Sequence, residues 1–276
     1  MAALLLLSAA GASAQALSSG GRVDGLANRV PQAAAADASR DDSAVEPDDD
    51  NTWEAVITDA HGDVSLLAAG SKSAVKAETG MPLASGDVVV AKDSSSVEIS
   101  FDGGAGLLQL GGGSSISIDS LQYDGTALSL KSGILLGMMV NLTDSYRSFA
   151  ISTAGGVCTV YGTEFAVAYM PQSRESRVGV FDDGHAGVTL FNASQEQQEL
   201  MLGREQEATF RDTAKTVRAR RMVMLADYTA AAALLPGRSQ ELGGSWKRMP
   251  LKQRQALRER FAPAATNSGD GGQDGE

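Results

Sequence analysis

Few residues in this 276-residue sequence could act as a nucleophile or as a general acid or base at neutral pH. It has one cysteine, Cys158, and two histidines, His61 and His185, each beside a glycine in a predicted turn. None of the three belongs to a HExxH, GxSxG or paired-cysteine pattern. Cys158 takes an alternating position in GVCTVYG, where we expect a small buried hydrophobic side chain rather than a nucleophile.

Acidic side chains offer two further kinds of chemistry. Asp182 and Asp183, together with Glu164, could supply the two carboxyl groups that a glycosidase needs, although the sequence does not show that they converge. The aspartate run 48–50 could bind calcium weakly, but no EF-hand-like spacing follows it, and a solvated acidic run is the better interpretation. We therefore expect no enzyme activity, no cofactor and no metal site.

The N-terminal stretch MAALLLLSAAGASAQA has the pattern of a cleavable signal peptide over residues 1–14. A short apolar run leads to Ala12-Ser13-Ala14, and we expect cleavage after Ala14. The basic start of such signals is missing, so either the signal is atypical or the true start lies upstream of Met1. The alternative, the tail of a membrane anchor, is disfavoured because the run is too short to span a bilayer. We expect a periplasmic or secreted protein with no stable membrane span in the mature chain.

Charge divides the chain into an acidic body and a basic C-terminal part. Residues 15–52 are rich in Ala, Ser and Asp and predict a disordered acidic leader. Residues 53–210 carry 19 acids and 8 bases, whereas residues 211–262 carry 4 acids and 12 bases. Residues 263–276 predict a disordered tail. With a pI near 4.7, an exported chain of this kind is not expected to bind nucleic acid.

The elements that would position any site are short strands. From Trp53 onward, segments such as GDVVVA, SSVEISF, GVCTVY and TEFAVAY alternate or run apolar over a few residues, with turn signals such as Ser85-Gly86-Asp87 between them. No amphipathic helix interrupts this series. The pattern predicts an all-β domain over residues 53–210, an antiparallel β-sandwich or β-roll of many short strands.

The basic segment, residues 211–262, predicts a small α-helical region. In RDTAKTVRARRMVMLADYTAAAALL the apolar positions can share one helix face, and Pro236-Gly237 predicts its end. A second helix is expected over residues 251–261 between two prolines. This segment could engage an acidic surface or an anionic polymer. The simpler interpretation is a helix that packs Trp246, Leu257 and Phe261 on the β domain.

Three blocks of the β region resemble the FecR domain, the periplasmic domain of the iron-dicitrate sensor and anti-sigma regulator family. They are GDVVVAKDSSSVEISFDGG, STAGGVCTVYGTEFAV and VGVFDDGHAGVTL, within about residues 55–205. Ala154 stands where the family commonly has proline, and Lys92 where it commonly has threonine. The family's cytoplasmic region and transmembrane helix have no counterpart here, so we do not carry over anti-sigma activity.

The residues that carry this resemblance also have a physical reading as fold determinants. Glycines and aspartates of the motifs suit tight turns, and the apolar members suit a buried strand face. Within VYGTEFAV, a bulge or tight bend at Gly162-Thr163 would reset which side chains point inward. The motif residues are Gly86, Asp87, Phe101, Asp102, Gly103, Gly162, Thr163, Phe165 and Val167.

The resemblance implies an exported, non-catalytic binding or sensory module of the bacterial cell envelope. Its partner would be an envelope protein or an anionic polymer. Two alternatives stay open: a scaffold that self-associates through its β domain, and a regulator of sigma-factor signalling if the true start lies upstream and includes a membrane anchor.

Overall fold

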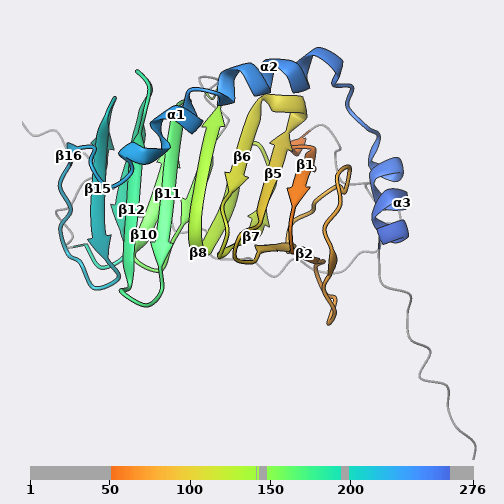
Figure 1. Ribbon diagram of the computed structural model, residues 1–276, viewed down its shortest axis with the longest axis horizontal. Coiled ribbons are helices and arrows are strands. Elements are labelled where there is room, and N and C mark those ends of the chain that lie inside the picture. Colours follow the sequence, from red (N-terminus) through yellow and green to blue (C-terminus); the bar gives the residue numbers. More distant parts are fainter. Residues whose placement is uncertain (1–50, 141, 143–147, 194–198, 262–276) are drawn as a thin grey trace, which may run out of the picture. The chain divides into compact units, whose positions relative to one another are not determined.

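The computed structural model describes residues 51–140, 142, 148–193 and 199–261. They form a mostly β domain followed by a C-terminal helical segment (Figure 1). The predictions of a signal peptide over 1–14, a disordered leader over 15–52 and a disordered tail over 263–276 lie, apart from residues 51 and 52, outside the described residues.

The strands form two layers that share the long strand β8 (Thr126–Met139). Its first half pairs with β7 and β9, and its second half pairs with β6 and β11. The layer that we call the covered layer also contains β1 (Ala55–His61), β5 (Ser96–Phe101), β6 (Gly106–Leu110), β11 (Glu164–Met170), β12 (Glu175–Val180), β15 (Gln206–Arg211) and β16 (Arg220–Arg221). The uncovered layer also contains β2 (Val64–Leu67), β3 (Val75–Lys76), β4 (Val88–Ala91), β7 (Ser114–Ser120), β9 (Phe149–Ser152), β10 (Gly156–Val160), β13 (Ala186–Leu190) and β14 (Leu200–Leu202).

The predicted all-β class is confirmed, and one strand pair departs from the antiparallel expectation. β9 runs parallel to the first half of β8, with Thr126 opposite Phe149. The other named strand pairs are antiparallel. β8 crosses from one layer to the other. The chain then runs back to the beginning of β8, where β9 pairs beside it. The Ser148 N–H bonds to the Tyr123 carbonyl there at 2.9 Å.

The main core lies between the two layers and is centred on aromatic side chains. Trp53, Phe101 and Phe149 are fully buried. Phe101 meets Trp53 and Phe149 edge to face, with ring centroids 6.2 and 5.6 Å apart. The Trp53 indole N–H donates to the Thr126 hydroxyl at 2.8 Å, so its one polar atom is satisfied.

The two layers differ in how many faces they bury. In β10 of the uncovered layer, buried and half-buried residues alternate, as expected when one face meets the core. In β11 of the covered layer, the five consecutive residues 165–169 are all buried. Phe165 and Val167 face the main core, while Ala166 belongs to a second apolar cluster on the outer face. That second cluster is completed by residues of the C-terminal segment: Met222, Leu225, Ala232 and Leu235.

VYGTEFAV is a corner between the layers rather than a bulge in one strand. β10 ends at Val160 and pairs with β9 and β13, whereas β11 begins at Glu164 and pairs with β8 and β12. Gly162 takes a φ of 87°, in the left-handed region that favours glycine. Of the two alternatives, the backbone therefore has the tight bend.

We expect Gly162→Val to lower the free energy of unfolding by about 1–3 kcal/mol, the usual cost of a side chain held at an unfavourable φ. A Cβ there would meet no atom closer than 3.8 Å, so no clash is added to the backbone strain. Urea denaturation checks this value. Loss of the folded state altogether would contradict it.

The C-terminal segment is less helical than its sequence pattern predicts. Residues 212–225 contain only the two-residue strand β16, so the predicted helix is wrong over this part. Pro236 does not end a helix, because it lies in the first turn of α2 (Leu235–Ser245), where no intrahelical N–H is needed. The other helical elements are η2 (Asp102–Gly104), η3 (Ala226–Tyr228), α1 (Thr229–Ala232) and α3 (Leu251–Phe261). α3 has the predicted bounds.

Candidate functional site

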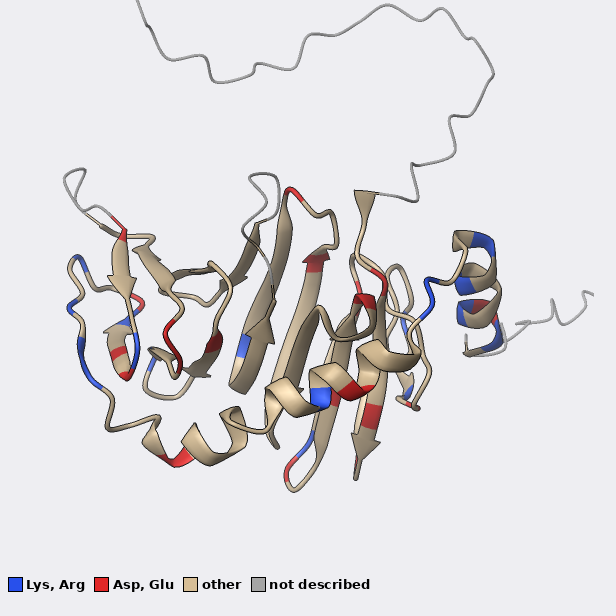
Figure 2. Ribbon diagram, turned by 90° about the horizontal axis from the view of Figure 1, so that it is seen from above, with Lys and Arg blue, Asp and Glu red and all other residues tan. Residues whose placement is uncertain are grey.

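Residues 220–261, which we call the C-terminal arm, are fastened to the β domain by arginines. The arm runs across the outer face of the covered layer through η3, α1 and α2 and then places α3 beside the domain (Figures 1 and 2). Four of these arginines pair with acids of the β domain, and each of those four acids has a side chain at most 10% exposed. The pairs are Arg220–Glu207 (3.0 Å), Arg238–Glu98 (3.0 Å), Arg248–Asp102 (3.2 Å) and Arg258–Asp87 (2.6 Å).

Asp87, which follows Gly86 in the turn before β4, is fully buried. Its carboxylate accepts the Ala69 and Ala84 amides, each at 2.9 Å. Arg258 donates to it from both terminal nitrogens, at 2.6 and 2.9 Å. The carboxylate therefore joins three separate parts of the chain, and a two-point arginine contact is the strong form of such a pair.

Asp102, the second motif aspartate, also pairs with an arginine of the arm, Arg248. Its Oδ1 accepts the Glu54 N–H at 2.8 Å and Arg248 Nη1 at 3.2 Å, and its Oδ2 accepts the Tyr123 hydroxyl at 2.5 Å. Arg248 also donates to the Tyr123 oxygen at 2.8 Å and to the Thr52 carbonyl at 2.6 Å. Burial, and then the bond to Asp102, raise the pKa of Tyr123 above its ordinary value, so the phenol stays a donor.

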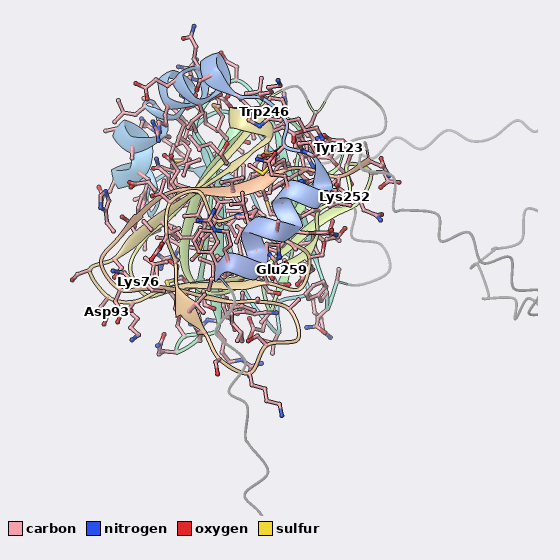
Figure 3. The ribbon with its side chains drawn as sticks, turned by 90° about the vertical axis from the view of Figure 1, so that its right-hand side faces the viewer. Lys76, Asp93, Tyr123, Trp246, Lys252 and Glu259 are labelled. Carbon is pink, nitrogen blue, oxygen red and sulfur yellow. The ribbon has the colours of Figure 1, made fainter. Side chains whose placement is uncertain are left out.

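The Trp246 ring packs directly against the backbone of Gly103. An added Cβ at Gly103 would be 1.9 Å from Cγ of Trp246, so only glycine fits beneath this ring. Next to it, the Ser239 hydroxyl donates to the Gly104 carbonyl at 2.7 Å. Figure 3 faces α3 and shows Trp246 near the end of α2. The DG turn of the resemblance is thus a docking point for the arm.

Glu98 on β5 and Glu207 on β15 serve as further anchors. Glu98 accepts Arg238 through Nε and Nη2 at 3.1 and 3.0 Å. Glu207, fully buried, accepts Arg220 Nε at 3.0 Å and the Leu225 amide at 3.1 Å. Both acids lie on strands, and both receive donors from the arm.

We expect the α2 anchor to weaken in acid. Burial alone would raise the pKa of Glu98, but the bonds from Arg238, Thr58 and Gln109 outweigh it and hold the pKa below its ordinary value of 4.5. A lowered folded pKa means that the contribution is complete above 4.5 and is lost as pH falls through the folded pKa. The urea midpoint of the wild type should exceed that of Glu98→Gln at neutral pH, and the two midpoints should become equal in strong acid. A constant difference would contradict the expectation.

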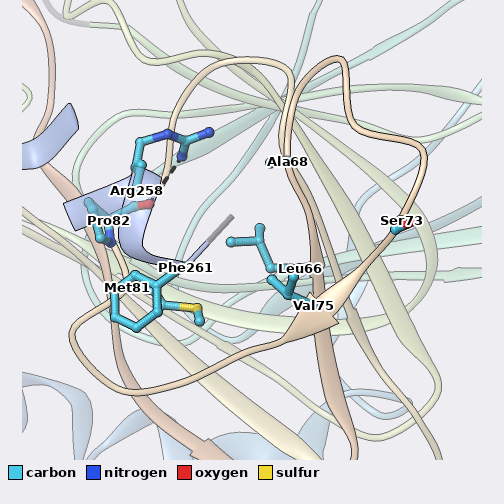
Figure 4. A pocket seen from close by; sticks show the side chains of 8 residues that line it. All are labelled: Leu66, Ala68, Ser73, Val75, Met81, Pro82, Arg258 and Phe261. Carbon is cyan, nitrogen blue, oxygen red and sulfur yellow. Dashed lines mark hydrogen bonds between the residues drawn. The ribbon is translucent and has the colours of Figure 1, made fainter. Parts of the chain in front are cut away.

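α3 has gaps on both sides of its contact with the β domain. One small apolar gap of about 40 Å³ is lined by Leu66, Met81 and Phe261, with Arg258 bonded to the Pro82 carbonyl at its rim (Figure 4). A wider gap of about 300 Å³ lies between α3 and residues 83–85. The contact of α3 with the β domain therefore combines incomplete packing with the buried anchor of Arg258 on Asp87.

Cys158 is 2% exposed and belongs to the main core. Burial, and then the charge of Glu199, raise the pKa of its thiol to about 12. We expect alkylation by iodoacetamide at pH 8 to be about 100-fold slower in the native chain than in urea, because the thiolate is the reactive form. Equal rates in the two states would contradict this.

The acids considered for a glycosidase site have structural partners. Asp182 accepts the Thr163 hydroxyl and, at 3.0 Å, the Gly184 amide, so it holds the turn opposite the β10–β11 corner. Asp183 is exposed and pairs with Arg204. Burial, and then Asp182, raise the pKa of Glu164. These acids line neither of the two gaps beside α3.

The histidines and the aspartate run give no catalytic arrangement. His61 is exposed and pairs with Asp59 at 3.0 Å, and His185 is exposed in a separate turn. In the part of the chain that the structure describes, no three His, Cys, Asp or Glu side chains gather closely enough to hold a metal ion. The run 48–50 lies outside that part.

The motif residues have two kinds of placement. Phe101, Phe165 and Val167 are fully buried in the main core, and Gly162 and Thr163 form the corner. Gly86, Asp87, Asp102 and Gly103 instead lie where the arm docks. Sequence reasoning missed the acids Glu54, Glu98 and Glu207; the one available signal was a basic segment following an acidic body.

Comparisons with known proteins give a distant likeness. No family model matches the chain, and no curated protein matches it. Two crystal structures of a candidate anti-sigma factor from Parabacteroides distasonis ATCC 8503 are similar, each with a TM-score of 0.42. Identities are 12% and 13%, with 50% and 54% of this chain covered. The match spans 61% and 64% of those chains, which is less than two thirds of their length.

The fold and the contacts of the C-terminal arm define the structural class of the protein. It is a mostly β domain whose C-terminal arm is docked through arginines that pair with buried carboxylates. Within residues 51–140, 142, 148–193 and 199–261, no helix has the length and apolar character needed to cross a membrane.

Proposed function

We propose that this chain is an exported, non-catalytic binding and sensory module of the bacterial cell envelope, and that it signals by holding or releasing its own C-terminal arm. The observation that carries the proposal is that both motif aspartates, Asp87 and Asp102, are occupied by arm arginines. Four of the nine motif residues of the FecR resemblance, Gly86, Asp87, Asp102 and Gly103, thus lie where the arm docks.

Charge also supports a state-dependent interaction. The arm arginines that could bind an anionic polymer or an acidic partner are Arg220, Arg238, Arg248 and Arg258, and in the docked state they are paired with acids of the β domain. Release would expose basic groups on the arm and acids on the β domain together. A partner protein that binds either surface would shift the equilibrium by its differential affinity for the two states.

The partner is tested by comparing two double variants with wild type as bait in bacterial envelope extract. Arg248→Ala/Arg258→Ala removes two docking arginines, while Lys247→Ala/Lys252→Ala removes the same charge from exposed positions of the arm. We expect at least one envelope protein whose recovery changes by about tenfold in the arginine variant only. Recovery of only copies of this chain would favour the self-associating scaffold, and unchanged recovery in both variants would refute the sensory role.

Export is tested separately by fractionating cells that express the full chain. We expect protein that lacks residues 1–14 in the periplasm or medium. Intact protein confined to the cytosol would refute the export part of the proposal.

A further inference from the structure

A cavity of about 250 Å³ lies between the outer face of the covered layer and the C-terminal arm. β1 is the last strand on its side of this layer, since among named strands it pairs only with β5. α2 covers the neighbouring strands, so a space remains above β1. Val56 and Ser100 line it from the strands, and Leu242, Trp246 and Met249 line it from the arm. We call this space the Ser100 cavity.

Ser100 is the residue that indicates a ligand. It is 3% exposed, and its hydroxyl has no hydrogen-bond partner. Its neighbour on the same strand face, Glu98, accepts bonds from Thr58, Gln109 and Arg238. Buried hydroxyls are normally bonded, because an unmade bond costs the desolvation of the group. The cavity therefore holds an unused polar group beside apolar walls.

Glu54 supplies a second polar group at the same cavity. It is 4% exposed, and its Oε2 accepts the Met249 amide at 2.7 Å. No described residue donates to its Oε1, which leaves an acceptor for a ligand. A carboxylate next to a free hydroxyl favours a hydrogen-bond donor and disfavours an anion.

We propose that the Ser100 cavity binds a small molecule with an apolar body and a hydrogen-bond-donating head, a hydroxyl or a protonated amine. The head bonds to Glu54 and Ser100, and the body lies against Val56, Leu242 and Trp246. The volume is just below the roughly 300–1,000 Å³ of drug-sized sites, which sets the ligand at a few carbons in length.

This ligand would act on the same arm that the proposed function invokes, and the coupling rests on that function. The arm provides part of the cavity wall, so a bound molecule stabilises the docked state by mass action. Binding itself does not depend on any envelope partner.

Three probes of equal chain length test the chemistry: hexylammonium, 1-hexanol and hexanoate. Titrations of the full chain are followed by calorimetry and by tryptophan fluorescence, in which a ligand-dependent change is assigned to Trp246 because Trp246 lines the cavity and Trp53 does not. We expect saturable binding of hexylammonium and 1-hexanol, and binding of hexanoate weaker by about tenfold or more. No saturation by any probe would mean that water alone meets the Ser100 hydroxyl, and would overturn the proposal.

Variants locate the binding. Val56→Phe fills the cavity and should abolish binding, and Ser100→Ala should weaken it by about fivefold or more without lowering the melting temperature, because it removes an unbonded group. Ser115→Ala, the same change on the uncovered layer, should bind as wild type. Equal affinity in wild type and both cavity variants would refute the site.

The arginine double variant separates the two proposals. If probes bind wild type and bind the Arg248→Ala/Arg258→Ala variant about tenfold more weakly, the site and its coupling to the arm both stand. Equal binding would leave the cavity as a site and refute the coupling. Partner capture in envelope extract can fail or succeed independently of either result.

Discussion

Asp87→Asn is expected to lower the free energy of unfolding by about 3–5 kcal/mol, the range found when one partner of a buried ion pair is removed. The Asp87 side chain is fully buried and that of Arg258 is 24% exposed, so solvent screens the pair little. An asparagine of the same shape would also turn an NH₂ group toward donors, since every partner of Asp87 is an N–H group.

Urea denaturation at pH 7 measures this effect from the midpoint at constant slope. The matched control is Asp63→Asn, because Asp63 also pairs with one cation, Lys92 at 2.7 Å, but with both side chains more than 60% exposed. That change should cost less than about 1 kcal/mol. If both variants lose the same free energy of unfolding, burial of the Asp87–Arg258 pair does not account for the effect of Asp87→Asn.

Gly103→Ala is expected to expel Trp246 and to detach the arm around it, at a cost of about 2–4 kcal/mol from overpacking and a positive φ. Gly103 has a φ of 64°, and the new Cβ would overlap the indole. The three atoms nearest to that Cβ all belong to the Trp246 side chain, so the indole is the group that must move. Tryptophan emission should shift to the red, and the linker between α2 and α3 should become sensitive to protease.

Gly237→Ala controls for the loss of a glycine as such. It lies in α2, and an added Cβ there meets nothing within 4 Å. Alanine is the better helix former by about 1 kcal/mol, so this variant should be slightly more stable than wild type. Unchanged emission and protease resistance in Gly103→Ala would show that Trp246 is not seated on this turn.

The strands were predictable because alternation reflects a local property, the burial of one face. In the alternating segment SSVEISF, Val97, Ile99 and Phe101 all lie in the main core. The structure of VYGTEFAV was harder to predict. A strand that changes layers and a strand with a bulge both change which alternate residues point inward. The partners of β10 and β11, which distinguish the two, lie elsewhere in the sequence.

The docking site was not predictable from local pattern. Glu54, Glu98 and Glu207 read as ordinary outward-facing acids of strands, and nothing near them in sequence indicates burial. Their partners are remote: Met249 is 195 residues from Glu54, and Arg238 is 140 residues from Glu98. Likewise, residues 212–225 have helix-forming composition, but bonds to Glu207 and apolar packing hold residues 220–225 in a non-helical conformation.

The remoteness of these pairs has a consequence for folding. Contacts between residues so far apart form late, and the arm is also synthesised after the β domain. The outer face of the covered layer, with Leu107, Leu136 and Met138, is therefore exposed while the arm is absent. During that interval Glu98 and Glu207 lack their arginine partners, and these two acids on the same sheet oppose aggregation of the apolar surface.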